Sequence, residues 1–291
     1  MRILSIQSSV AYGHVGNSAA TFPLQRLGHE VWPVNTVHFS NHTGYGQWRG
    51  PVLDPADVRE VIGGIAERGV LGTVDAVLTG YQGSPGVADV VLDTVAQVRE
   101  LNPNVIYCCD PVLGDVGRGF FVLQGIPALM RDQVVPTADI VTPNLFELAY
   151  LAGDSPHPEN APADVSTQDA VLAAVERVRG LGPRTVLVTS VDRPAGPGAA
   201  EIGMLAVDDS GAYLVSTPRL PISVNGLGDV TAALFLAQLS AGIDVALGRV
   251  ASSVFAIAKA TVEAGSREIL LIDAQQQIAH PAAEFEVSKI G

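Results

Sequence analysis

Short apolar segments alternate with amphipathic ones along this chain, and this alternation limits the possible folds more than any other feature. Segments typical of buried strands are residues 2–8, 30–36, 74–79, 105–109, 139–141 and 185–189, and segments with helical patterns are residues 19–27, 55–68, 87–101, 145–151 and 167–181. Strands joined by helices are typical of a mostly parallel sheet that is covered on both faces. We therefore predict an α/β fold, and since no repeat or linker divides the 291 residues, a single domain over residues 1–291.

The last third of the chain has a different pattern. Residues 201–207 and 212–217 flank Asp208-Asp209-Ser210-Gly211, which predicts a β-hairpin. Two long apolar helices are expected at residues 229–241 and 245–264. The proline-rich and polar segment 155–163 is expected to be a surface loop.

Charge and hydropathy exclude several classes of partner. The formal net charge of -13 argues against nucleic acid or an anionic membrane surface as a partner. No uninterrupted apolar run reaches the roughly 18 residues that a membrane span needs, and the apolar start of the chain is too short for a signal peptide. We therefore expect a soluble, cytoplasmic protein without a nucleic-acid or membrane partner.

The scarce lysines and cysteines exclude further chemistry. Lys259 and Lys289 are the only lysines, and neither lies in the Gly-Lys-Ser or Gly-Lys-Thr context of a Walker A loop. Their positions, in an apolar helical run and in the tail, also disfavour an internal Schiff base. Cys108 and Cys109 are adjacent, which suits neither a disulfide framework nor a zinc site, so we predict two buried thiols at a strand end.

Polar residues at the ends of the predicted strands mark the place to look for a site, because ligands of such sheets bind beyond the carboxyl ends of the strands. The residues in question are Ser8, Tyr81, Asp110, the segment 142–147 and Thr189.

The strongest local signal is Asn225-Gly226-Leu227-Gly228-Asp229, which opens a long apolar helix. Free N–H groups at a helix start bind anions, and Gly226 and Gly228 allow a phosphate to approach the backbone closely. Asp229 could then accept the proton of a substrate hydroxyl that attacks the γ-phosphate of ATP. The alternative is an ordinary glycine turn, since aspartate is favoured at helix starts in any case.

A second signal is Thr142-Pro143-Asn144-Leu145-Phe146-Glu147, which follows a strand and opens a helix. Asn144 and Glu147 share a helix face, where an amide and a carboxylate can position water around Mg²⁺. The alternative, which stays open at this point, is a capping arrangement in which Glu147 reaches back to the helix start.

The third signal is Asp110-Pro111-Val112-Leu113-Gly114-Asp115. Asp110 ends a buried strand, so its carboxylate needs a cation or a hydrogen-bond donor. Residues 114–119 are typical of a mobile loop, and we interpret residues 112–121 as a lid over a nucleotide. Arg118 either approaches the transferring phosphate or is a solvated loop side chain. His14, His38 and His42 show no metal spacing on one helix and are expected to line a pocket or to form hydrogen bonds.

Together these segments resemble the ribokinase superfamily and, more closely, the pyridoxal kinases. The resemblance covers nearly the whole chain and includes residues 5–8, 13–17, 19–25 and 78–81 besides the three signals above. Its most specific part is Phe39-Ser40-Asn41-His42-Thr43-Gly44-Tyr45, within an expected flap near residues 38–46.

The resemblance implies a ribokinase-like fold and ATP-dependent phosphorylation of the 5′-hydroxymethyl group of pyridoxal, with pyridoxine and pyridoxamine as further substrates. It also implies Mg²⁺, K⁺ and a homodimer. The implied base is Asp229, with Gly226 and Gly228 as the anion hole. The implied substrate contacts are Ser8, Val15, Thr43, Gly44, Tyr81 and Asp229. The implied ATP or cation contacts are Asp110, Asp115, Thr142, Glu147 and Thr189, with Asp110 and Glu147 nearest the metal and Asn144 acting through water.

The chain departs from the family pattern at a few positions. Ser9 stands where histidine is common, and Phe121 stands where some relatives have tyrosine. Thr43-Gly44 and Thr189 replace the Thr-Gln and lysine of some bacterial members. These departures bear on nucleotide affinity and substrate preference more than on the type of reaction.

Three other functions remain alternatives: a hydroxymethylpyrimidine or sugar kinase of the same superfamily, a non-catalytic vitamin B6 binder, and a Rossmann-type dehydrogenase. The flap sequence disfavours a sugar kinase. The combined presence of Asp229, Gly228, Asp110 and Glu147 disfavours a mere binder. No G-x-G-x-x-G motif follows the first strand, which disfavours the dehydrogenase.

Overall fold

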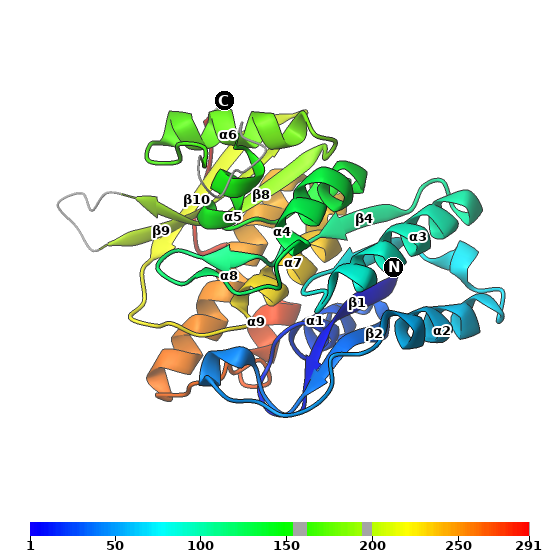
Figure 1. The fold of residues 1–291 in the computed structure, drawn as a ribbon. Helices are drawn as coiled ribbons and strands as arrows, with labels where there is room; N and C mark the ends of the chain where they lie inside the picture. The colour runs from blue at the N-terminus through cyan, green and yellow to red at the C-terminus, as the bar shows by residue number, and fades with distance from the viewer. Residues whose placement is uncertain (154–161, 194–199, 291) are drawn as a thin grey trace.

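A central sheet of nine strands organises the computed structural model, which describes residues 1–153, 162–193 and 200–290 (Figure 1). The strands are β1 (Arg2–Val10), β2 (Glu30–Phe39), β3 (Ala76–Thr79), β4 (Ile106–Cys109), β7 (Ile140–Val141), β8 (Thr185–Arg193), β9 (Glu201–Asp208), β10 (Gly211–Pro218) and β11 (Val287–Lys289). Their order is β11-β10-β9-β8-β7-β4-β3-β1-β2. The six neighbouring strands β2, β1, β3, β4, β7 and β8 are parallel to one another. Strands β9, β10 and β11 continue the sheet, and each is antiparallel to the strand before it. The predicted mostly parallel sheet and the hairpin between β9 and β10 are confirmed.

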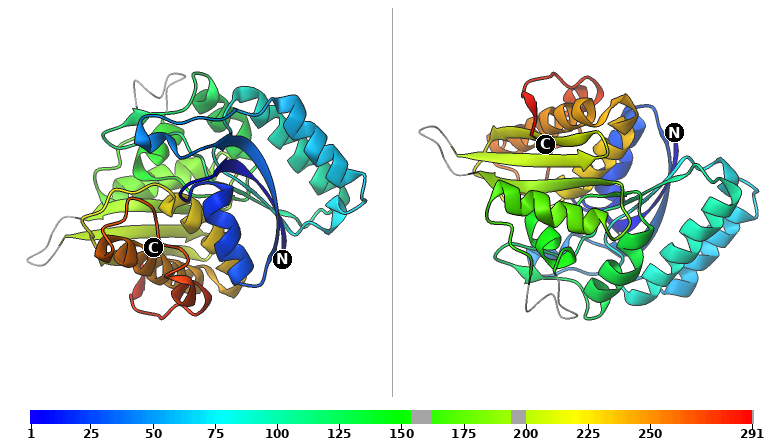
Figure 2. Two further views of the ribbon diagram at one scale, coloured as in Figure 1. Left: turned by 90° about the horizontal axis from the view of Figure 1, so that it is seen from below. Right: turned by 90° about the horizontal axis from the view of Figure 1, so that it is seen from above.

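Helices cover both faces of the sheet, so the fold has three layers (Figure 2). One face carries α1 (Asn17–Arg26), α7 (Leu227–Gln238), α8 (Ile243–Glu263) and α9 (Gln275–Ala279). The other carries α2 (Pro55–Ala66), α3 (Pro85–Leu101), α4 (Ile126–Leu129), α5 (Leu145–Leu151) and α6 (Gln168–Arg179). Single turns are η1 (Thr43–Tyr45), η2 (Leu71–Thr73), η3 (Met130–Val134), η4 (Val135–Thr137) and η5 (Leu239–Ala241). The predicted cap of α2 is confirmed, because the Asp54 carboxylate accepts the N–H of Ala56 at 2.8 Å.

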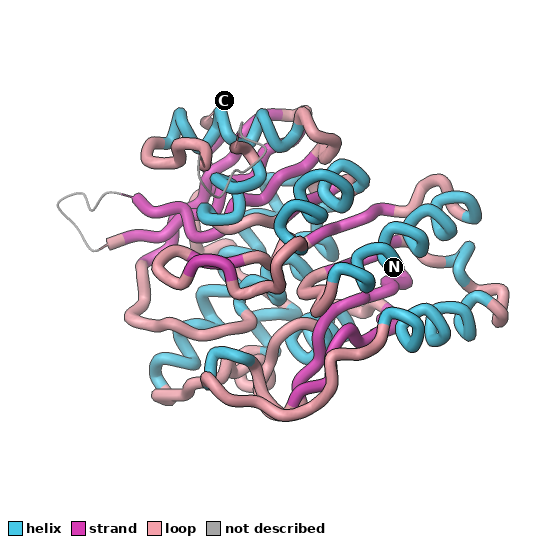
Figure 3. Tube along the Cα trace, in the orientation of Figure 1, coloured by secondary structure: helices cyan, strands magenta, loops and turns pink. Residues whose placement is uncertain are grey.

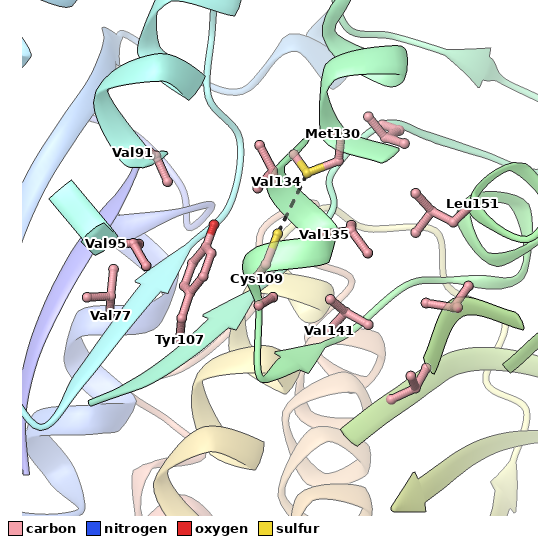
Figure 4. Packing of buried hydrophobic residues seen from close by; sticks show 14 of the residues in the cluster. Val77, Val91, Val95, Tyr107, Cys109, Met130, Val134, Val135, Val141 and Leu151 are labelled. Atoms are coloured by element: carbon pink, nitrogen blue, oxygen red, sulfur yellow. Dashed lines mark hydrogen bonds between the residues drawn. The ribbon is translucent and has the colours of Figure 1, made fainter. Parts of the chain in front are cut away.

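The short central strand β4 is buried on both faces of the sheet, which explains why its sequence is apolar. Tyr107 and Cys109 point into the cluster on the α3 and α4 side, where Cys109 Sγ lies 3.7 Å from Met130 Sδ (Figure 4). Cys108 faces the opposite cluster, under α7. Both thiols are free and buried, as predicted, and burial raises their pKa, that of Cys109 to about 12.

Helix α8 is long and apolar enough to cross a bilayer, yet 61% of its most apolar window is buried inside the protein. It packs against α7, β9 and β10, where its apolar face completes one of the two core layers. This packing is typical of a core helix.

The predicted loop at residues 114–119 is instead a short hairpin of β5 (Gly114–Asp115) and β6 (Gly119–Phe120). The Phe120 side chain fixes this hairpin on α5, because its ring packs edge-on against Phe146 at 5.0 Å and against Tyr150 at 5.1 Å. The prediction missed the hairpin because these contacts are with α5, far along the chain. Of the surface loop predicted at residues 155–163, residues 155–161 lie outside the described part of the chain.

The order of the strands changes direction between β1 and β3. The chain runs from β1 to its neighbour β2 on one side and then continues through β3 and β4 on the other side. Strand β1 pairs with β2 on one side and with β3 on the other, and the following helices α1 and α3 lie on opposite faces. The loops after β1 and β3 therefore diverge at their carboxyl ends and leave a crevice there.

Candidate active site

A cavity of about 210 Å³ opens at this crevice. It collects most of the residues singled out in the sequence, although they come from widely separated segments. Those that line it are Ser8, Val15, Thr43, Tyr81, Asp110, Asp115, Arg118, Phe121, Thr142, Asn144, Glu147, Thr189, Gly226, Gly228 and Asp229. Gly44 is not among them: it lies against Asn225 and borders a neighbouring cavity.

One end of the cavity is apolar. Val10, Val37 and Phe39 form a small buried cluster, against which Val15 and Tyr81 pack. The Thr36 hydroxyl donates a hydrogen bond of 2.7 Å to the Tyr81 carbonyl oxygen, which ties the loop after β3 to β2. The sequence analysis named Phe39 only as part of the flap sequence and missed Val10 and Val37, although their inward-facing positions near the ends of β1 and β2 could have indicated them.

The other end of the cavity is the start of α7. Gly226 has a φ of +96°, and a Cβ atom there would collide with the carbonyl oxygen of His14. Only glycine combines that backbone conformation with such close contact. The first N–H groups of α7 have no intrahelical acceptor, so this end of the cavity attracts an anion.

Asp229 lies in the first turn of α7 and is half-buried at the cavity. Burial raises its pKa to about 6, while hydrogen bonds from the backbone N–H of Gly16 and from its own N–H act in the opposite direction. The carboxylate is therefore mostly ionised at neutral pH and can accept a proton. Gly16 is packed so tightly on Ser8 that a Cβ there would collide with the serine hydroxyl.

Asp110 follows β4 and is buried, with its Oδ1 atom accepting a hydrogen bond of 3.2 Å from the Thr142 hydroxyl. Burial and the charges of Glu147 and Asp229 hold the pKa of Asp110 well above its usual range. Three acidic side chains thus converge at the polar end of the cavity, an arrangement that a cation would stabilise.

Glu147 is bound by backbone N–H groups on two sides. Its Oε1 atom accepts from Leu113 at 2.9 Å and from Gly114 at 3.4 Å, and its Oε2 atom accepts from Asn144 at 2.9 Å. The Asn144 side chain in turn accepts the Glu147 N–H, so the capping box considered in the sequence is present. Burial raises the pKa of Glu147 to about 7 against these hydrogen bonds. The glutamate therefore joins the start of α5 to the hairpin.

Thr189 reaches the cavity through an irregularity in β8. The strand pairing with β9 shifts between Val188 and Val191, and Ser190 there has a φ of 57°. The Thr189 N–H donates to the Pro143 carbonyl at 2.9 Å, which brings Thr189 beside the start of α5.

Arg118 projects from the hairpin toward α7. Its Nη1 atom lies 3.3 Å from the Asn225 Oδ1 atom, and its guanidinium lies 5.1 Å from the centre of the Phe121 ring. The contact with Asn225 places a cation close to the start of α7. Among the residues described around the cavity, Arg118 is the only arginine, and the two lysines lie elsewhere, Lys259 near Glu263 and Lys289 against Ser210.

The acidic residues fit a magnesium ion of the kind that stays partly hydrated. Within residues 1–153, 162–193 and 200–290, no group of three or more His, Cys, Asp or Glu side chains could hold a metal ion. Mg²⁺ is commonly held by one or two carboxylates together with waters and substrate phosphates. Asp110 and Glu147 supply two carboxylates to the same cavity.

Comparisons with known proteins agree with this site. Residues 53–264 match the family described as phosphomethylpyrimidine kinase. The chain is 56% identical over its whole length to a protein of Leifsonia xyli named pyridoxal kinase PdxY, all of which is covered. A protein of Rubrobacter xylanophilus with the same name is 57% identical, with 100% of this chain and 98% of the relative covered.

Solved structures show the same likeness. The pyridoxal kinase of Leishmania donovani in complex with ADP and pyridoxine superposes with a TM-score of 0.89 at 29% identity, covering 100% of this chain and 99% of the other. That of Trypanosoma brucei has a TM-score of 0.86 at 30% identity, with 99% of each chain covered. The fold, the arrangement of acidic and glycine residues at the start of α7, and these full-length similarities lead to one conclusion: the chain belongs to the pyridoxal kinase family, with a ribokinase-like fold.

Proposed function

We propose that this enzyme transfers the γ-phosphate of ATP to the 5′-hydroxymethyl group of pyridoxal, with pyridoxine and pyridoxamine as further substrates, in vitamin B6 salvage. The observation that carries the proposal is that Asp229, in the first turn of α7, lines the same cavity as the apolar cluster of Val10, Val37 and Phe39. A base there would share one cavity with an aromatic alcohol at the apolar end and a phosphate at the start of α7. The relatives named pyridoxal kinase support the choice of alcohol.

The apolar end of the cavity suits a pyridine ring. Val15 and Tyr81 offer apolar surface on which the ring can pack, while Ser8 and Thr43 offer hydroxyl groups for its polar substituents. Gly44 would affect vitamin binding indirectly, because a side chain there would push against Asn225 and the His42 ring. With the ring in this position, its 5′-hydroxymethyl group would be directed toward Asp229.

The chemistry requires few parts. The 5′-oxygen attacks the γ-phosphorus, its proton passes to the Asp229 carboxylate, and the bond from the γ-phosphorus to the bridging oxygen breaks so that ADP leaves. The N–H groups at Gly226 and Gly228 stabilise the charge that develops on the phosphoryl oxygens, in place of the lysine of a Walker A loop. Arg118 lies close enough to the start of α7 to add a further positive charge.

Asp110 and Glu147 would hold Mg²⁺, with Asn144 reaching it through water, and Thr142 and Thr189 would contact the phosphates beside it. The ion neutralises negative charge on the phosphates when it is bound. A potassium ion completes the proposed set of cofactors.

The nucleoside of ATP needs space beyond the first cavity. A second cavity of about 310 Å³ adjoins it, and Asn225, His42 and the flap residue Gly44 border it. Ile222 and Val224 from the segment before α7 and Val262 from the end of α8 give it apolar walls. We place the nucleoside there, with the phosphates entering the first cavity past Asn225 and the segment 112–121 as the lid.

We also propose that the enzyme is a homodimer and that it works in the cytoplasm. The net charge of -13 suits a dissolved enzyme better than one that binds membranes or nucleic acid. Light scattering of the purified protein measures the size of the assembly directly.

The decisive experiment measures ADP release with Mg²⁺-ATP and K⁺, with and without pyridoxal, for the wild type and for Asp229→Asn. We expect pyridoxal-dependent release, reduced by several powers of ten in the variant. Asp244→Asn is the matched control, since Asp244 occupies the first turn of α8 but is exposed and outside the cavity. Near-normal turnover of Asp229→Asn would remove Asp229 from the role of base.

A substrate panel separates the remaining candidates. Pyridoxine, pyridoxamine and hydroxymethylpyrimidine are compared with pyridoxal by kcat/KM, because the matching family is described as phosphomethylpyrimidine kinase. A clear preference for hydroxymethylpyrimidine would overturn the proposed substrate while leaving the mechanism intact. Saturable pyridoxal binding without any ADP release would indicate a binder.

A further inference from the structure

Glu268 is a buried carboxylate that none of the sequence signals indicated. It lies in the segment between α8 and α9 and is 8% exposed. Its backbone is fixed locally, since the Ser266 hydroxyl bonds both its N–H and its carbonyl oxygen, and the next residue, Ile269, is fully buried. A charged group held rigidly in such a place requires partners that compensate for its lost hydration.

The partners of Glu268 come from the two loops that line the first cavity. Its Oε1 atom accepts hydrogen bonds from His42 Nε2 at 3.0 Å and from the Tyr45 hydroxyl at 2.7 Å. Its Oε2 atom accepts the backbone N–H of His14 at 3.2 Å. The flap and the loop between β1 and α1 thus meet at one carboxylate, and Figure 1 shows the short turn of the flap, in blue, beside the orange end of α8.

Two of these bonds fix a residue next to one that lines the cavity. His42 precedes Thr43, and His14 precedes Val15, and both Thr43 and Val15 line the cavity. The carbonyl oxygen of His14 also lies directly against Gly226, so the position of His14 affects the start of α7 as well.

The base of the flap is held internally, since the Asn41 side chain donates to the carbonyl oxygens of His42 and Gln47, but its tip is less regular. It is an irregular stretch with one short turn, as Figure 3 shows, and Thr43 and Gly44 are exposed. Tyr45 is held by Glu268 and by the guanidinium of Arg267, which stacks 4.3 Å from its ring centre. Gly13 has no side chain in the space that the Glu268 carboxylate occupies, which allows this close approach.

We propose that Glu268 is a positioning residue for phosphoryl transfer. By binding His42, Tyr45 and His14, it fixes the flap and the loop after β1 relative to each other and to the bound vitamin. The proposal rests on the proposed function. It predicts that loss of the carboxylate weakens vitamin binding more than ATP binding, since Thr43 and Val15 line the first cavity.

The test compares steady-state kinetics of Glu268→Gln, Tyr45→Phe and the double variant with the wild type, with direct pyridoxal titration in the absence of ATP. Hydrogen bonds to a charged group are typically strong enough that Glu268→Gln should raise the KM for pyridoxal about tenfold to a hundredfold. The KM for ATP should rise by a smaller factor, because His42 also borders the second cavity while the walls from the segment before α7 and the end of α8 stay in place. Tyr45→Phe should raise the KM for pyridoxal severalfold in the wild type but have little effect in the Glu268→Gln background, because the two side chains act through one contact.

Two controls distinguish positioning from general destabilisation. Glu263→Gln removes an exposed carboxylate near the end of α8 and should leave both KM values unchanged. Thermal unfolding shows whether each variant is folded at the assay temperature. An unchanged KM for pyridoxal in folded Glu268→Gln, or fully additive effects in the double variant, would overturn the proposal.

The role of Glu268 can still be tested if one variant does not fold or if the wild type shows no turnover. If Glu268→Gln does not fold, Tyr45→Phe alone decides, and an unchanged KM for pyridoxal in that variant rejects the proposal. If the wild type binds pyridoxal without turnover, the proposed function fails, while the titration of the variants still tests the role of Glu268.

Discussion

Replacing Asp229 by asparagine should make the ligand-free protein more stable while removing its activity. The pKa of Asp229 is raised from 3.8 to about 6, mainly by burial. One pKa unit corresponds to about 1.4 kcal/mol, so the ionised carboxylate lowers the free energy of unfolding by about 3 kcal/mol at most at pH 8. The half-buried side chain meets water in the cavity, and two N–H groups bond to it, so we expect asparagine to gain about 1–3 kcal/mol.

The gain should depend on pH in a defined direction. Because the pKa is higher in the folded state than in the unfolded state, the stability contributed by the protonated form is fully present below the unfolded value. It is lost as the pH rises through about 6. Asparagine stays neutral throughout, so the advantage of the variant should be largest at pH 8 and roughly half as large near pH 5.

Urea unfolding at both pH values, with a chelator and without nucleotide, measures this difference. Asp244→Asn serves as the exposed control and should change the free energy of unfolding by less than about 0.5 kcal/mol. A variant that is less stable than the wild type at pH 8, or whose advantage is the same at both pH values, would refute the reasoning.

Three further outcomes are expected. Gly226→Ala should abolish turnover and lower the unfolding midpoint in urea, because its Cβ would collide with the His14 carbonyl at a φ of +96°; a folded, active variant would contradict the proposed anion hole. Phe120→Ala removes the ring that holds the hairpin on α5 and should raise the KM for ATP severalfold with little change for pyridoxal; equal changes in both would argue against a nucleotide lid. Cys108 and Cys109 should resist a thiol reagent in the folded protein and react at once in denaturant, since burial raises the pKa of both; rapid labelling of the native protein would contradict this.

Most of the fold could be predicted from the sequence because it depends on local pattern. The apolar periodicity identified all six parallel strands and the hairpin between β9 and β10, and Asp54 marked the start of α2. The misses were short or irregular elements, such as β11 and the hairpin at Gly114–Phe120, in which few residues carry a periodic signal and order comes from distant contacts.

The candidate site was predictable to the extent that it uses helix starts and strand ends. The glycines before Asp229 and the polar residues that follow several strands occupy positions where ligands bind in such folds, so the sequence by itself determined which residues gather at the carboxyl edge of the sheet, although not what they bind. It also determined, through the placement of two lysines, that the phosphate is not held by a Walker A loop.

Only the tertiary structure decided what these residues touch. Glu147 has both of its oxygens bonded to backbone N–H groups, one of them across 34 positions of the chain, and Glu268 meets the flap across 226 positions. Burial, which depends on the packed fold, raises the pKa of Asp110, Glu147 and Asp229, and neighbouring carboxylates raise it further at Asp110 and Glu147. A sequence lists the ionisable groups, but the cost of burying a charge and the partners that offset it exist only once distant segments are packed together.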